Sequence, residues 1–273
     1  MIVRVEAPGD PRLAPYRALK DNEIARGFDG FIVEGAIALE RLIASGRFPL
    51  QSVFLSERAA DRLESLLARI SPTIPVYVAA QDDMDEVAGY HLHRGVMALA
   101  QRVAAESPQQ MLQSHSAERL TVLVLIGLSN HDNVGACFRN AAALGADMVL
   151  LDESSCDPLY RKAIRVSSGA ALSLPFAHGG TGDELISLLK ASGVACWAMT
   201  PLDSEALATL DPPDRLAVLL GPEGPGLSGG LMQRCQRVSI PMAGGMGSLN
   251  VATAGAIALA HIMARRGTGQ SPV

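Results

Sequence analysis

The sequence has little of what marks several common classes of protein. Its four cysteines lie far apart among 273 residues and form no CxxC pair, which excludes a zinc-finger spacing and a disulfide framework and favours a reducing cytoplasm. No apolar run reaches the roughly 20 residues that a membrane-spanning helix needs, and residues 1–17 contain no signal-peptide core. Aromatic residues make up only 4% of the chain, so Ala, Val and Leu must fill its core.

The familiar nucleotide-binding and metal-binding patterns are also absent from the sequence. The turn after the first long apolar run reads GLSNHDNVG instead of GxGxxG, and no Gly-Lys-Ser/Thr phosphate loop occurs. A net charge of −5 disfavours a protein that wraps nucleic acid, although it is compatible with a local basic site. His91 and His93 alternate on an extended stretch with no nearby Cys or acidic partner, so we expect no metal site.

The pattern of apolar residues divides the chain into two α/β domains. Residues 1–20 contain three prolines and are expected to form a partly ordered arm. Residues 21–103 alternate helices with short strands and form a small α/β domain. Residues 104–119 are polar and read as a linker. Residues 120–273 form the second domain.

The second domain opens with TVLVLIGL at 121–128, a continuous apolar run typical of a central strand in a parallel sheet. Helices then alternate with strands to the end of the chain, which favours a parallel, doubly wound sheet. The expected helices span 133–145, 183–193 and 248–266, and the expected further strands span 147–152, 194–200, 216–221 and 237–242.

Three polar, glycine-rich segments follow apolar strands of this domain. They are 130–135, with Arg139 one turn into the next helix, then 221–228, and 239–257. Ligands of open parallel sheets lie beyond the carboxyl ends of the strands, and glycine lets the backbone approach a ligand closely. The three segments together therefore predict a cofactor pocket.

These segments resemble the SpoU (TrmH) family of S-adenosylmethionine-dependent RNA ribose 2′-O-methyltransferases, within the SPOUT class. The resemblance covers 121–266 and extends more loosely to 24–103, where FIVEG and HRGVMALA match an α/β domain similar to ribosomal RNA-binding proteins. The matching residues are Asn133, Val134, Gly135, Arg139, Ala141 and Gly145, then Leu219 to Leu227, then Ile240, Pro241, Met242 and Ser248 to Ala252.

The resemblance implies a fold that the residue pattern by itself does not show. The C-terminal parallel sheet would carry a trefoil knot, beside a smaller N-terminal α/β RNA-binding domain, and the enzyme would be a cytoplasmic homodimer. The small side chains of 252–260 suit a helix that passes close to other backbone. Three departures from the family pattern are His93-Arg94-Gly95, Met246 and Ala252-Thr253.

The resemblance also implies roles for individual residues. The residues expected to bind S-adenosylmethionine are Thr200, Leu220, Gly221, Ile240, Met242 and Leu249. The residues expected at the catalytic centre are Arg139, Asn133, Glu223, Ser248 and Asn250. Arg165, Ser167 and Ser168 are expected to contact RNA phosphates. No metal is expected.

Each of these roles has a plainer alternative. A ribose 2′-OH is a poor nucleophile, and the Arg139 cation would lower its pKa or act as the base, yet Arg139 is also a reasonable surface arginine. Asn133 and Ser248 are both candidate helix caps. Glu223 pairs with an arginine, such as Arg139 across a dimer, or is simply solvated.

We therefore expect methyl transfer from S-adenosylmethionine to a ribose 2′-OH of structured RNA, with rRNA favoured over tRNA. One alternative is a non-catalytic knotted RNA-binding protein that acts in ribosome assembly. The other is an RNA base methyltransferase of the same superclass.

Overall fold

The computed structural model describes residues 2–17, 29–243 and 247–267. Met246, one of the departures from the family pattern, lies outside the described residues. Backbone contacts divide the chain into two compact units. The first contains Met1–Ala104 and Leu159–Ser173, and the second contains Ala105–Pro158 and Leu174–Val273.

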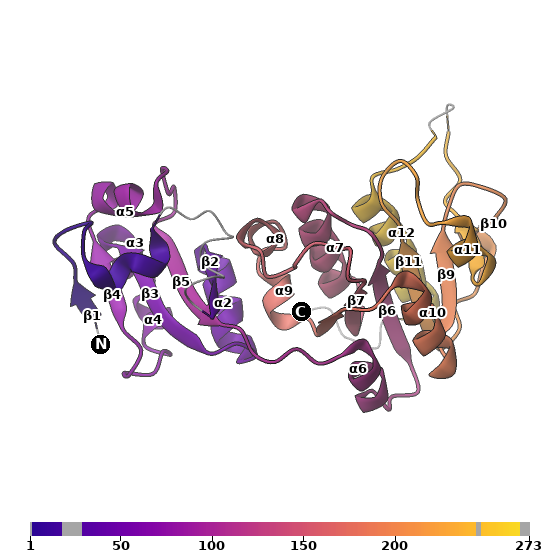
Figure 1. Ribbon diagram of the computed structural model, residues 1–273, viewed down its shortest axis with the longest axis horizontal. Coiled ribbons are helices and arrows are strands. Elements are labelled where there is room, and N and C mark those ends of the chain that lie inside the picture. Colours follow the sequence, from indigo (N-terminus) through magenta and orange to yellow (C-terminus); the bar gives the residue numbers. More distant parts are fainter. Residues whose placement is uncertain (1, 18–28, 244–246, 268–273) are drawn as a thin grey trace. The chain divides into compact units, whose positions relative to one another are not determined.

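The first unit is built on a five-stranded sheet of order β1-β4-β3-β5-β2 (Figure 1). Strand β5 runs antiparallel to β2 and β3, and the other pairs are parallel. The strands are β1 (Ile2–Arg4), β2 (Gly30–Glu34), β3 (Leu50–Ser56), β4 (Val76–Ala79) and β5 (Val96–Gln101). The helices are η1 (Pro11–Tyr16), α2 (Ala36–Ser45), α3 (Glu57–Arg62), α4 (Glu64–Leu67), α5 (Gln81–Ala88), α8 (Arg161–Val166) and α9 (Ala170–Ser173).

The N-terminal segment is more firmly integrated than a partly ordered arm. Strand β1 pairs with β4, and the side chains of Leu13 and Tyr16 in η1 are buried beside those of α5. The Tyr16 hydroxyl lies 2.7 Å from that of Ser52 in β3. The described part of residues 1–20 therefore contributes to the core of the first unit, since three prolines do not prevent a 3-10 turn from burying its apolar face.

The second unit is built on a seven-stranded, wholly parallel sheet of order β10-β12-β9-β11-β6-β7-β8 (Figure 1). The parallel sheet predicted for this part of the chain is confirmed. The strands are β6 (Leu120–Leu125), β7 (Met148–Leu151), β8 (Phe176–His178), β9 (Ala195–Met199), β10 (Glu205–Ala206), β11 (Arg215–Leu220) and β12 (Gln236–Ser239). The helices are α6 (Pro108–Ser114), α7 (His131–Ala143), α10 (Gly182–Ala191), η2 (Leu207–Thr209), α11 (Gly229–Gln233) and α12 (Val251–Arg266).

Helices cover both faces of this sheet, which explains why β6 is apolar at every position. The side chains of Val122 and Val124 pack with those of α6, α10 and α11 on one face. On the other face, α7 packs against α12, and Gly255 of α12 lies directly over Leu220 and Leu123. Among the described residues, no helix is long and apolar enough to cross a membrane.

Two segments differ from what their residue patterns predict. The polar segment 104–119 contains helix α6, which Ser107 and Gln110 cap reciprocally and whose Met111 and Leu112 are buried in the second unit. The apolar spacing of residues 58–70 is typical of one amphipathic helix, but the segment forms two short helices, α3 and α4, separated at Leu63. Burial of Met111 and Leu112 against tertiary neighbours accounts for α6, and local periodicity does not report such burial.

Candidate active site

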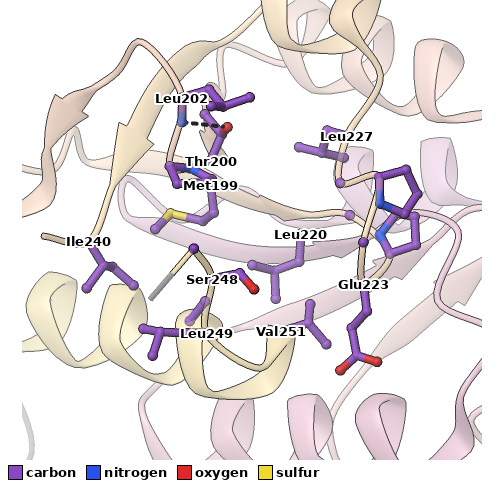
Figure 2. A pocket seen from close by; sticks show the side chains of 18 of the residues that line it. Met199, Thr200, Leu202, Leu220, Glu223, Leu227, Ile240, Ser248, Leu249 and Val251 are labelled. Carbon is purple, nitrogen blue, oxygen red and sulfur yellow. Dashed lines mark hydrogen bonds between the residues drawn. The ribbon is translucent and has the colours of Figure 1, made fainter. Parts of the chain in front are cut away.

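A cavity of about 610 Å³ lies at the carboxyl ends of β9, β11 and β12, where the start of α12 closes it. Figure 2 shows Met199 and Thr200 on one side, Leu249 on the opposite side and Leu220 between them. All six residues that the sequence singled out for cofactor binding line this one cavity. They come from four separate stretches of the chain, and the parallel sheet brings the stretches together because it aligns the ends of its strands.

Gly221 fixes the shape of the loop on the β11 side of the cavity. A Cβ atom on Gly221 would lie 2.5 Å from the Leu227 nitrogen and 2.7 Å from the Gly226 carbonyl carbon. The loop turns back on itself here, and the Gly226 N–H donates to the Pro222 carbonyl at 3.0 Å. Because backbone atoms make this contact, no side-chain rotation would relieve a substitution.

Sequence reasoning missed several apolar residues of the lining. These are Met199, Pro201, Leu202, Leu227, Met232, Val238, Val251 and Ala254. Thr200 is held by its own turn, because its hydroxyl oxygen accepts from the Leu202 N–H at 3.2 Å (Figure 2). Their positions offered a signal, because Met199 ends β9 directly before Thr200 and Leu202 lies two residues after Thr200.

Three of the predicted catalytic residues form one hydrogen-bonded cluster. The Asn250 side-chain amide donates to the Asn133 Oδ1 at 3.0 Å and to the Glu223 Oε1 at 3.1 Å. Asn133 is buried, with 8% of its surface exposed, whereas Glu223 and Asn250 are exposed. Glu223 also lines the cavity, beside Val251 in Figure 2, so the cluster joins the cavity to helix α7.

The helix caps near the site are not the predicted ones. Helix α7 begins at His131, and its cap is Asn130, whose side chain accepts from the Asp132 N–H. Helix α12 begins at Val251, three residues after Ser248, the cap that the sequence suggested. Its cap is Asn250, whose Oδ1 accepts from the backbone N–H groups of Ala252 and Thr253 in the first turn of the helix. Capping by Asn133 or Ser248 is therefore wrong.

Asn250 consequently has two functions at once. Its oxygen caps α12 while its nitrogen holds Asn133 and Glu223. A second bond ties the same two helices together, since the Asn140 side-chain amide of α7 donates to the Ala252 carbonyl at 2.9 Å. The start of α12 is thus held against α7 by two asparagines.

Among the described residues, Arg139 and Ser248 make no hydrogen bond to this cluster. The Arg139 side chain is exposed, and the structure gives its guanidinium no hydrogen-bond or ion-pair partner among the residues that it describes. Ser248 is exposed and lines the cavity. Within the described chain Glu223 accepts from Asn250, and its pairing with Arg139 across a dimer stays a prediction.

The three predicted RNA-contact residues belong to the first unit. Arg165 is exposed and lies 3.8 Å from the Glu34 carboxylate, and Ser168 is partly exposed. Ser167 is fully buried, and its hydroxyl donates to the Ile164 carbonyl at 2.9 Å. Because no phosphate can reach a hydroxyl with no exposed surface, the prediction for Ser167 is wrong.

Two observations bear on other reactive groups. His91 has an acidic partner after all, because its Nδ1 lies 2.5 Å from Asp85, although no metal-binding cluster of His, Cys, Asp or Glu occurs in the described residues. Cys137 of α7 is buried, and burial raises the pKa of its thiol to about 12. A thiol with that pKa is not a nucleophile at neutral pH.

Comparison with known proteins identifies the family. Residues 120–260, just over half of the chain, match the profile of the SpoU rRNA Methylase family. The chain belongs to the SpoU family. It is therefore an RNA methyltransferase of that family, and the predicted membership is confirmed.

Relatives and solved structures match this SpoU protein over most of its length. An uncharacterized tRNA/rRNA methyltransferase of Mycobacterium tuberculosis is 40% identical over 92% of this chain and 88% of the relative. A crystal structure of an RNA 2′-O ribose methyltransferase aligns with a TM-score of 0.80 at 24% identity, over 97% of this chain and 99% of that one. An rRNA methyltransferase from Sinorhizobium meliloti with AdoMet bound gives 0.80 at 21% identity, over 96% and 97%. The two structural matches show the shared fold.

Proposed function

We propose that this SpoU enzyme methylates a ribose 2′-OH of structured RNA with S-adenosylmethionine as the methyl donor. One observation carries the proposal: a single cavity is lined by all six predicted cofactor residues. Glu223 and Asn250 of the hydrogen-bonded Asn133–Asn250–Glu223 cluster line the same cavity. Names of relatives support it, since one solved neighbour is a 2′-O ribose methyltransferase and others hold AdoMet.

The lining suits S-adenosylmethionine chemically. A volume of about 610 Å³ lies within the range of about 300–1,000 Å³ typical of small-molecule sites. Leu220, Ile240 and Leu249 offer apolar walls for a purine. Among the described lining residues Glu223 is the one charged side chain, so a cationic ligand is favoured over a polyphosphate. When bound, this donor supplies an electrophilic methyl group on a positively charged sulfur.

The residues of the chain then have separate tasks. The fixed cation of Arg139 would stabilise the ribose oxygen as the hydroxyl proton passes to solvent water, and the guanidinium would stay protonated throughout. Asn250 holds the Glu223 carboxylate at the rim of the cavity, and Asn133 in turn orients Asn250. Ser248 offers a hydroxyl on the same rim.

Arg139→Ala is expected to lower kcat/KM about 100- to 1,000-fold and to leave the affinity for S-adenosylmethionine unchanged, because Arg139 does not line the cavity. Turnover is measured by transfer of a tritiated methyl group to RNA, and affinity by calorimetry. Unchanged turnover would contradict a catalytic role for this arginine.

The reaction class is tested with the wild-type protein. Tritiated-methyl transfer to total RNA, followed by mass spectrometry of the nucleosides, should yield 2′-O-methylated nucleosides. A methyl group on a base would identify a base methyltransferase, and cofactor-independent RNA binding without any transfer would identify a non-catalytic protein. We favour ribosomal RNA as the substrate, because the chain matches the profile of the SpoU rRNA Methylase family.

We also propose a knotted second unit and a homodimer in the cytoplasm. Support for the knot is the close passage of α12, where a Cβ atom on Gly255 would lie 2.8 Å from the Leu220 Cδ1. Support for the dimer is the exposed Arg139 on α7 and the exposed Ile257 on α12, two helices that pack together. The four free cysteines suit a reducing compartment. Light scattering that shows a fully active monomer would refute the dimer.

A further inference from the structure

Side chains of a neighbouring turn, rather than another strand, accept the N–H groups of the loop between β6 and α7. Ile126 still donates to the last carbonyl of β11, at 3.0 Å. Gly127 donates to the Oδ1 of Asp152, the first residue after β7, at 2.9 Å. Leu128 donates to the Ser155 Oγ in the same turn at 3.1 Å. Because a buried backbone N–H without an acceptor is costly, this turn fixes where the loop runs.

The turn that accepts these bonds is itself closed and buried. Asp152 and Ser155 each expose 5% of their surface. The Ser155 hydroxyl donates to the Asp152 Oδ1 at 2.6 Å, and the Ser155 N–H donates to the same oxygen at 3.0 Å. Cys156 returns a bond to the loop, because its N–H donates to the Leu128 carbonyl at 2.8 Å. We refer to Asp152 and Ser155 together as the loop clamp.

The loop clamp makes no direct contact with a ligand. Neither of its side chains lines the S-adenosylmethionine cavity, and neither is exposed enough to meet RNA. A buried carboxylate is costly unless donors compensate it, and Asp152 accepts from two N–H groups and two hydroxyls, one of them that of Ser154 at 2.5 Å. The donors on the far side of the clamp belong to the loop, so the loop is what the carboxylate holds.

The clamped loop determines where α7 starts. Only Ser129 and Asn130 separate Leu128 from the first residue of that helix, and Asn130 is its cap. Asn133 lies in the first turn of α7, and Arg139 lies six residues further along it. Because a helix transmits displacement as a rigid element, a shift of its start would move both side chains relative to the cavity.

We propose that Asp152 and Ser155 are positioning residues for methyl transfer, which hold the loop at 126–130 and thereby set where α7 presents Asn133 and Arg139. This inference rests on the proposed function in so far as these two residues of α7 belong to the catalytic centre, and it holds for either a ribose or a base as acceptor. Misplacing a catalytic group by about 1 Å costs about 100-fold in rate. Release of the loop should therefore affect turnover far more than cofactor binding.

The test compares kcat with the KM for S-adenosylmethionine in tritiated-methyl transfer to a saturating amount of total RNA. Asp152→Ala should lower kcat about 10- to 100-fold and change this KM by less than about threefold, because Asp152 does not line the cavity. Asp152→Asn should restore at least about a third of the wild-type kcat. Its Oδ1 can accept from the same N–H groups, and its Nδ2 can donate to the Ser154 hydroxyl.

Ser155→Ala removes only the acceptor of the Leu128 N–H and leaves the Asp152 carboxylate in place. It should lower kcat about 3- to 10-fold, again with little change of KM, because one of the two bonds to the loop remains. Thermal melting establishes that each variant is folded. If Asp152→Ala does not fold, Ser155→Ala and Asp152→Asn decide by the same comparison of kcat with KM.

Asp147→Ala is the matched control. The Asp147 carboxylate also accepts a backbone N–H between β6 and β7, that of Thr121 at 2.7 Å, but at the amino ends of these strands and away from the loop. This variant loses the same kind of bond and should keep the wild-type kcat.

The outcomes separate the positioning role from the proposed reaction. A kcat for the clamp variants equal to that of Asp147→Ala would overturn the positioning role and leave the reaction intact. So would an Asp152→Asn variant as slow as Asp152→Ala, because the loss would then follow the charge and not the bonds to the loop. A methyl group on a base in the wild-type product would refute the proposed reaction, whereas a lowered kcat of Asp152→Ala for that same transfer would support the positioning role.

Discussion

Asn250 offers the sharpest test of how the candidate site is held together. Its Oδ1 accepts from Ala252 and Thr253 at the start of α12, while its Nδ2 donates to Asn133 and Glu223. Asn250→Ala removes both sets of bonds. Loss of a helix cap costs about 1 kcal/mol, and the buried Asn133 oxygen that loses its donor costs about 1–2 kcal/mol more. The expected loss of stability is therefore about 2–3 kcal/mol.

Two further variants separate the contributions. The Asn130 side chain caps α7 and makes no hydrogen bond to Asn133 or Glu223. Asn130→Ala should therefore lower the free energy of unfolding by about 1 kcal/mol. Asn250→Asp retains a capping oxygen but replaces the donor with a carboxylate next to that of Glu223. It should abolish most methyl transfer, because like charges at this distance repel and the Asn133 oxygen has lost its donor.

Urea unfolding of the second unit is the appropriate measurement, because the single tryptophan, Trp197, is buried in its sheet and reports on that unit. Methyl transfer is measured in parallel. The reasoning is refuted if Asn250→Ala costs no more than Asn130→Ala, since the amide bonds to Asn133 and Glu223 would then contribute nothing. Full activity of Asn250→Asp would refute it independently.

Two other predictions concern the cavity and the thiols. Gly221→Ala should weaken S-adenosylmethionine binding at least tenfold in calorimetry, because its Cβ would meet the Leu227 nitrogen at 2.5 Å, whereas Gly229→Ala, with open space around it, should bind normally. Cys235 should be the first thiol to react with a disulfide reagent as pH rises, because a hydrogen bond from Cys196 lowers its pKa while those of the other three cysteines are raised. Loss of the fast phase in Cys235→Ser checks this assignment, and a fast phase that persists contradicts it.

Local sequence was a good guide wherever a residue's role depends on its own neighbours along the chain. The apolar run that begins at Thr121 gave a central parallel strand because residues buried on both faces must all be apolar. The glycine-rich loops after β11 and β12 were expected to form a pocket, and they line one cavity.

Sequence was a poor guide where one side chain chooses between several partners. Asn133, Ser248 and Asn250 are all chemically able to cap a helix, yet the cap of α12 is Asn250 and that of α7 is Asn130. Ser167 and Ser168 are adjacent hydroxyls in the same motif, yet one is fully buried and the other lines a cavity. Burial separates them, and burial depends on segments far away in the chain.

The sequence by itself therefore determined the family, the parallel sheet and the strand-end loops in which the site lies, because these follow from periodicity and from motifs of a few residues. Only the tertiary structure decided that Asn133, Glu223 and Asn250, which are up to 117 positions apart, share hydrogen bonds. It also decided that Asp152 and Ser155 accept from Gly127 and Leu128. Contacts of this kind form where distant segments meet, and no local pattern records which segments those are.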